Sequence, residues 1–235
     1  RTWEVAPSYK SLIEGKGIVL IKEYATKIDA YKKEVFTASG LKIRYSKVVL
    51  ATGSKSDCLS VPGISKHALM FNTLIDVEIL RKVINDIKKS QKSSNSIVII
   101  GGGPSGVELA CKVSDLLRRT AEIHLIERQS IILSEGQAFN QEQSVKALDL
   151  RGIRVHLLTE VIEVTSKKVL LRSTSNEDPD YFEISHRGLI WTAGKKASFP
   201  EIIPQPSFSK GRIRIDCNLN VIGIENMMAI GDVSI

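Results

Sequence analysis

Three glycines have the spacing that lets a backbone turn bind a dinucleotide. An apolar run at 97–100 leads directly into Gly101, Gly103 and Gly106, and a helix-type pattern follows. The first glycine permits the tight turn, the second lets the backbone approach a pyrophosphate, and the third lets the helix pack on the strand. Free N–H groups and the positive end of the helix dipole would face that pyrophosphate. The strand before this glycine loop and the helix after it favour dinucleotide binding over an empty glycine-rich turn.

An acidic residue ends the next predicted strand, roughly 20 residues further on, where dinucleotide-binding folds place the ribose. Glu127 holds this position. Its carboxylate can accept hydrogen bonds from the ribose hydroxyls of NADH and would repel the 2′-phosphate of NADPH. We therefore expect NADH to be preferred. Arg128 could pair with that phosphate, so NADPH stays open as an alternative.

Three further glycine turns follow apolar runs. They are Ala51-Thr52-Gly53, Thr192-Ala193-Gly194 and Ile230-Gly231-Asp232. Each of them alone is an ordinary strand end, and the aspartate of the third could simply be a helix cap.

Residues 96–192 predict strands that alternate with helices. We expect strands at 96–100, 122–127, 154–158 and 189–192, helices at 104–119 and 140–150, and a β-meander over 163–172 and 180–184 around a turn at 176–179. The second helix should begin with a capping box of Asn140 and Gln143 and end near Gly152. This order predicts an α/β fold with a parallel sheet and crossover helices.

The flanking residues predict a β-rich region. We expect strands at 17–21, 35–37, 41–44 and 47–50, a hairpin turn at Ser39-Gly40, a helix at 73–89, a polar linker at 88–96, a loop at 197–211, and strands at 213–215 and 227–230. The chain starts with Arg1 and stops just after a glycine turn, so we expect both ends to be cut from something longer.

Composition limits the function classes. Hydrophobic residues make up 43% and charged residues 25% of the 235 positions, which is ordinary for a folded chain and excludes a disordered one. The apolar runs are far shorter than the roughly 18 residues that span a bilayer. The net charge of +7 is diffuse and aromatic residues are few, so we expect no nucleic-acid binding.

Cysteines and histidines show no pattern of a metal or redox site. Cys58, Cys111 and Cys217 are too far apart in sequence for a local dithiol. His124 and His156 alternate with apolar residues inside predicted strands, so we expect them to lie on the far face or to be satisfied in packing. No His, Cys, Asp and Glu group has metal-ligand spacing, and we predict no metal site.

Taken in order, the four glycine turns resemble those of the two-dinucleotide flavoproteins, the pyridine nucleotide-disulfide oxidoreductase fold. The similarity spans essentially the whole chain. It is closest to the type II NADH dehydrogenases, and within them to the plant and cyanobacterial branch, through the segments at 3–7, 105–112 and 140–152.

The resemblance implies a complete NAD(P)H-binding domain inserted into a partial FAD-binding domain. We expect residues 1–90 to form part of the FAD domain with a connecting helix, 91–200 the NAD(P)H domain, and 201–235 the return segment of the FAD domain. The family's first glycine motif and its C-terminal part, which shapes the quinone site and carries membrane-binding helices, have no counterpart in this chain.

The resemblance also implies roles for single residues. The glycine loop would hold the NADH pyrophosphate and Glu127 the adenosine ribose. Glu108 matches a glutamate near the nicotinamide and flavin, and Gly194 a glycine that lets the nicotinamide half pass close to the backbone. On the FAD side, Thr52 and Gly53 match a strand end against the cofactor, Asp232 the aspartate that binds the ribityl chain, and Gly231 the residue beside the FAD pyrophosphate.

The implied activity is hydride transfer from NADH to FAD and onward to an acceptor, with a quinone favoured. Two alternatives stay open: a relative that uses a protein acceptor, as ferredoxin reductases and apoptosis-inducing-factor-like proteins do, and a truncated, non-catalytic NAD-binding module. Peripheral attachment to an organelle or bacterial membrane and a homodimer are further expectations from the resemblance.

Overall fold

The computed structural model describes residues 7–56, 61–90, 95–175 and 178–235, so part of the 3–7 segment, Cys58 and part of the 176–179 turn lie outside the described residues. The chain divides into two compact units. The first unit comprises Arg1–Ser54 and Ala197–Ile235, and the second comprises Lys55–Lys196. The chain crosses between them through β5 (Ser54–Ser56) and β13 (Lys195–Ala197), which pair with each other.

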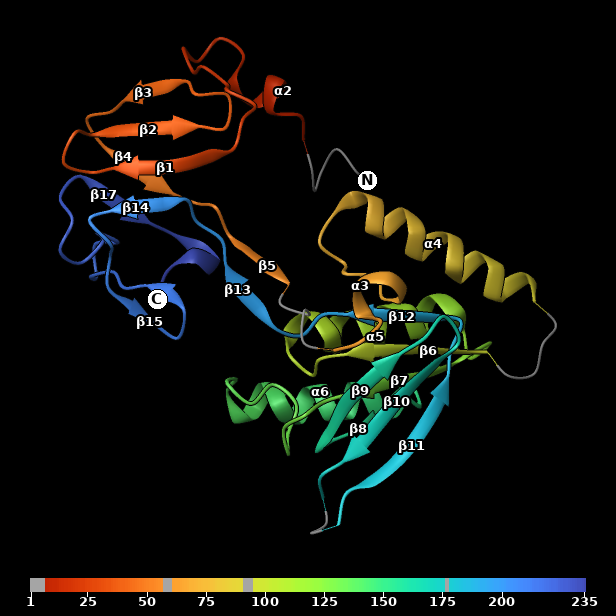
Figure 1. The fold of residues 1–235 in the computed structure, drawn as a ribbon. Coiled ribbons are helices and arrows are strands. Elements are labelled where there is room, and N and C mark those ends of the chain that lie inside the picture. The colour runs from red at the N-terminus through yellow and green to blue at the C-terminus, as the bar shows by residue number, and fades with distance from the viewer. Residues whose placement is uncertain (1–6, 57–60, 91–94, 176–177) are drawn as a thin grey trace. The chain divides into compact units, whose positions relative to one another are not determined.

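A four-stranded parallel sheet forms the centre of the second unit (Figure 1). Its order is β12 (Gly188–Trp191), β6 (Ser96–Ile100), β7 (Glu122–Ile126) and β8 (Arg154–His156). Every residue of β6 is buried, as expected for a parallel strand that is covered on both faces. The strand at 96–100 and the parallel sheet are thus confirmed.

Three helices cover one face of this sheet. They are α4 (Leu74–Lys89), α5 (Pro104–Leu117) and α6 (Ala138–Leu150). Ile97 and Ile99 of β6 pack with Leu80 and Ile84 of α4 in one apolar cluster. This packing explains why residues 61–90, which we expected to be part of the FAD domain at 1–90, belong to the second unit.

A second layer covers the opposite face. It consists of the short helix α3 (Ile64–His67) and an antiparallel meander of β9 (Thr159–Val164), β10 (Lys168–Ser173) and β11 (Asp180–Ser185). Val98 and Ile100 alternate with the residues that face the helices, and they pack against Val169 and Leu171 of β10. Successive side chains of β6 point to opposite faces of the sheet, so this one strand contributes to both apolar clusters.

The first unit is built from small sheets. One has the order β14 (Glu201–Ile203), β1 (Ala25–Asp29), β2 (Glu34–Thr37) and β3 (Lys42–Arg44); others pair β17 (Met227–Ala229) with β4 (Val48–Leu50) and β15 (Phe208–Ser209) with β16 (Arg212–Ile213). The short helix α2 (Tyr9–Ile13) and a 3-10 turn η1 (Gly231–Val233) complete it. Its core includes Ile28, Leu50, Ile213 and Met227, each at most 3% exposed.

Two sequence predictions for the first unit are wrong. Residues 17–21 form no strand, and Ile18–Ile21 are 40–82% exposed, because no strand within the described residues pairs with this apolar run. The expected loop at 197–211 contains β14, which pairs in parallel with β1. Pro200 and Pro204 lie just outside β14, where a missing N–H does not interrupt the ladder.

The capping box predicted at Asn140 is also wrong. Helix α6 begins at Ala138 after Gln137, whose side chain makes no capping hydrogen bond. A capping box occurs instead at α4, where the Thr73 side chain accepts the N–H of Asp76 and the Asp76 carboxylate accepts the N–H of Thr73. The sequence T-x-x-D at that point follows the same rule and was overlooked.

No helix in the described part of the chain is both long enough and apolar enough to cross a membrane.

Two leucines of α6 provide a matched test of the core. Leu148 is fully buried, whereas Leu150 is 79% exposed. Leu148→Ala should lower the free energy of unfolding by about 2–5 kcal/mol because it removes buried methyl groups and leaves a cavity. Leu150→Ala should change it by less than about 0.5 kcal/mol. Urea unfolding followed by circular dichroism measures both, and equal effects would contradict the placement of α6.

Candidate functional site

The glycine loop between β6 and α5 is shaped by close backbone approach. A Cβ added to Gly106 would lie 1.8 Å from the carbonyl oxygen of Gly101. At Gly101, whose φ is +109°, an added Cβ would lie 2.9 Å from the backbone nitrogen of Ala193. No atom lies within 4 Å of a Cβ added to Gly103. The first and third glycines are thus required by packing, whereas the second borders open space.

This open space lies at the N-terminus of α5. Gly103 is the N-cap residue and makes no side-chain capping bond, and Pro104 occupies the first turn. The N–H groups of a first helical turn have no partners within the helix. An uncapped helix start next to a position without a side chain can therefore bind an anionic group such as a phosphate.

Glu127 is fixed against the same loop. Its Oε2 accepts the N–H of Gly102 at 2.5 Å, and its Oε1 accepts the N–H of Gln129 at 2.8 Å. Its own N–H donates to the carbonyl oxygen of His156 at 2.8 Å. A Cβ on Gly102 would lie 2.9 Å from Glu127 Oε2. Position 102 therefore also favours glycine, in addition to the three glycines of the motif, and the sequence reasoning missed it.

A cavity of about 370 Å³ lies in the second unit beside α5. Ser105, Glu108 and Lys112 line it from one face of that helix, where residues three and four apart are neighbours. Thr192, which follows β12, and Lys195, the first residue of β13, line it on either side of Gly194. The volume is in the range of small-molecule sites.

The remaining wall comes from the segment that enters α4. Asn72 Nδ2 donates to Ser56 Oγ at 2.9 Å, and both residues line the cavity with Met70 and Phe71. The N–H of Asn72 donates to the Asp76 carboxylate at 2.8 Å, which fixes the segment to the helix start. Sequence reasoning missed this wall, since only the capping pattern of α4 points to it.

In the first unit, the structure brings two predicted turns together. Strands β4 and β17 are adjacent and parallel, so the turns that follow them lie at the same edge. Ser54 Oγ donates to Asp232 Oδ2 at 2.7 Å, a contact that no sequence motif predicts. Gly53 and Gly231 have φ of +66° and +75°, and no atom lies within 4 Å of a Cβ added to either. Thr52 is exposed beside them. This edge is therefore open to a ligand.

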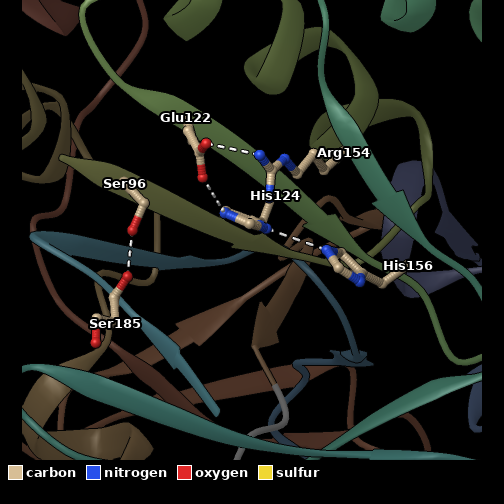
Figure 2. Close-up of polar contacts among 6 residues, drawn as sticks. All are labelled: Ser96, Glu122, His124, Arg154, His156 and Ser185. Atoms are coloured by element: carbon tan, nitrogen blue, oxygen red, sulfur yellow. Dashed lines mark hydrogen bonds and ion pairs between the residues drawn. The ribbon is translucent and has the colours of Figure 1, made fainter. Parts of the chain in front are cut away.

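Two histidines form a separate polar cluster on β7 and β8 (Figure 2). His124 Nδ1 and His156 Nε2 lie 3.1 Å apart, with the rings stacked. Glu122 pairs with Arg154 at 2.7 Å and lies 3.6 Å from His124 Nε2. The expectation that these histidines are satisfied in packing is confirmed. No group of three or more metal-ligating side chains in the described ranges could hold a metal ion.

This cluster should make the fold sensitive to acid. Burial, and then the neighbouring His156, lowers the pKa of His124; burial, and then Arg154, lowers the pKa of His156. The unfolded chain therefore takes up these protons at about pH 6.5, whereas the folded chain takes them up only at a lower pH. The free energy of unfolding should fall as the pH drops through about 6.5.

Urea unfolding at pH 7.5 and 5.5 measures this fall. In His156→Gln the fall in the free energy of unfolding between these two pH values should be smaller than in the wild type. It should not vanish, because burial also lowers the pKa of His186. An unchanged fall in the variant would remove the pair from the acid response.

Comparison with known proteins gives one family. Residues 5–234 match the sequence profile of the family described as pyridine nucleotide-disulphide oxidoreductase. The demethylphylloquinone reductase NdbB of Synechocystis is 31% identical over 238 residues, which cover 99% of this chain and 58% of that protein. The alternative NAD(P)H-ubiquinone oxidoreductase C1 of Arabidopsis thaliana is 28% identical over an alignment that covers 99% of this chain and 50% of that protein.

A solved structure has the same fold. The structure of NDH2 from Plasmodium falciparum in complex with NADH superposes with a TM-score of 0.76 at 21% identity, over 91% of this chain and 50% of that one. The chain thus spans about half the length of the relatives that it matches.

Proposed function

The chain belongs to the pyridine nucleotide-disulphide oxidoreductase family, and on that premise we propose that it is the NADH-binding part, with a portion of the FAD-binding part, of an NAD(P)H:quinone oxidoreductase. The observation that carries the proposal is the open, uncapped helix start at Gly103 with the Glu127 carboxylate fixed beside it. Relatives named as quinone reductases support the choice of acceptor class.

The glycine loop fits the NADH pyrophosphate. The space at Gly103 admits the phosphates, and the first-turn N–H groups of α5 donate to them. Each oxygen of Glu127 accepts one backbone N–H and keeps lone pairs for the ribose hydroxyls. The cavity along α5 takes the nicotinamide half, with Glu108 in its wall and Gly194 at its edge.

The open edge of the first unit fits part of FAD. Gly53 and Gly231 leave room for the cofactor to approach the backbone, and both have the left-handed backbone that glycine favours. Ser54 orients the Asp232 carboxylate, which can accept hydrogen bonds from ribityl hydroxyls. Thr52 lies at the same strand end. The flavin, when bound, supplies the redox chemistry, and these residues supply its position.

The proposal is tested by the visible absorption spectrum of the purified chain with added FAD, before and after anaerobic addition of NADH. We expect a bound-flavin band that NADH bleaches. Retained NADH binding without a flavin band would limit the function of this chain to the nucleotide site. Failure to bind either cofactor would contradict the proposal.

Gly103→Val is the matched control for that experiment. The position is open, so the variant should keep the fold, measured by circular dichroism, while its side chain fills the space for the pyrophosphate and abolishes NADH binding. Gly106→Ala differs, because its Cβ would collide with the backbone and should disturb the loop itself.

Glu127 sets the preference between the two nucleotides. Glu127→Arg removes the acceptor for the ribose hydroxyls and adds a cation for the 2′-phosphate. The Kd for NADH should rise about tenfold or more and the Kd for NADPH should fall, measured by isothermal titration calorimetry. Arg128→Gln is the neighbouring control, expected to keep the NADH preference. An unchanged ratio in Glu127→Arg would remove Glu127 from the ribose site.

A further inference from the structure

The cavity beside α5 has a charged wall that extends away from the glycine loop. Ser105 and Lys112 both line it, and seven helical residues correspond to about 10 Å along the axis. Glu108 lies between them. The wall therefore begins where the proposed pyrophosphate site ends and has room for a ribosyl ring and a nicotinamide.

The charge of Lys112 is only partly offset by its neighbours on the helix: after Arg151, the Lys112 ammonium helps to lower the pKa of Asp115. Glu108 precedes it by four residues, yet within the described residues the two side chains form no ion pair. Asp115, one turn further along α5, is held by Arg151 through two hydrogen bonds of 2.8 and 3.2 Å. Lys112 is exposed and lines the cavity.

The two redox forms of the nucleotide differ in one charge. The dihydronicotinamide ring of NADH is neutral, whereas the nicotinamide ring of NAD⁺ carries a positive charge. The phosphates, riboses and adenine are the same in both forms, so their contacts cancel in the ratio of the two affinities. A charge in the cavity wall therefore changes the affinity for NAD⁺ more than the affinity for NADH.

We propose that Lys112 lowers the affinity of this cavity for NAD⁺ relative to NADH and so favours release of the oxidised product. The inference rests on the proposed function, because it places the nicotinamide beside α5. Glu108 acts with the opposite sign, since its carboxylate attracts the oxidised ring. Lys195 also lines the cavity and has the same sign as Lys112, so the wall combines one carboxylate that attracts the oxidised ring with two lysines that repel it.

The experiment compares the Kd of NAD⁺ and of NADH for the purified chain by isothermal titration calorimetry at low salt. Charges in a water-exposed site change a binding constant by about two- to fivefold. Lys112→Gln should lower the ratio of the NAD⁺ Kd to the NADH Kd by that factor, and Glu108→Gln should raise it. The shifts should shrink as salt is added.

Two controls separate the ring charge from other causes. Lys112→Arg keeps the charge and should keep the wild-type ratio. Lys82→Gln changes the net charge equally on the exposed side of α4, outside the cavity lining, and should leave the ratio unchanged. A ratio in Lys112→Gln equal to the wild type, or equal shifts for both nucleotides, would overturn the role of Lys112. Failure of the wild type to bind either nucleotide would overturn the proposed function as well.

Discussion

The close approach of Gly106 to the carbonyl of Gly101 is the constraint on which the proposed nucleotide site depends. Because a Cβ at that point would lie 1.8 Å from the oxygen, only glycine lets α5 start directly over the end of β6. The same approach fixes where the helix axis points and thus where its uncapped N–H groups lie. The buried strand β6, packed on both faces, holds the other side of the turn. A loop of small residues is therefore rigid for steric reasons.

Glu127 extends this constraint to the neighbouring strand. Its carboxylate accepts the N–H of Gly102, so the end of β7 and the glycine loop share a hydrogen bond. Its backbone N–H donates to His156, which ties it to the end of β8 as well. A ribose bound at this carboxylate would act, through the hydrogen bond to Gly102, on the loop that is proposed to bind the phosphates. In the proposed site, recognition of the two parts of the nucleotide would thus be coupled through one side chain.

Sequence reasoning succeeded where the signal is local. The strand at 96–100, the helix after the glycine loop and the stripe of α4 follow from periodicity within one element, and the structure has all three. It failed where formation depends on a distant partner. Residues 17–21 are strand-like in composition yet unpaired within the described structure, whereas 201–203 form β14 because β1 lies alongside.

The same distinction between local and distant signals explains which parts of the candidate sites could be predicted from the sequence. The glycine loop and Glu127 are readable because their spacing is set by one strand–helix–strand unit. The Ser54–Asp232 bond joins residues 178 positions apart, and the cavity wall at Asn72 is built from a helix entry that only the capping pattern at Thr73 and Asp76 marks. The glycines indicate a candidate nucleotide site because their role is steric and independent of context. The charge of a side chain such as Lys112 acquires meaning only from the cavity that the fold builds around it.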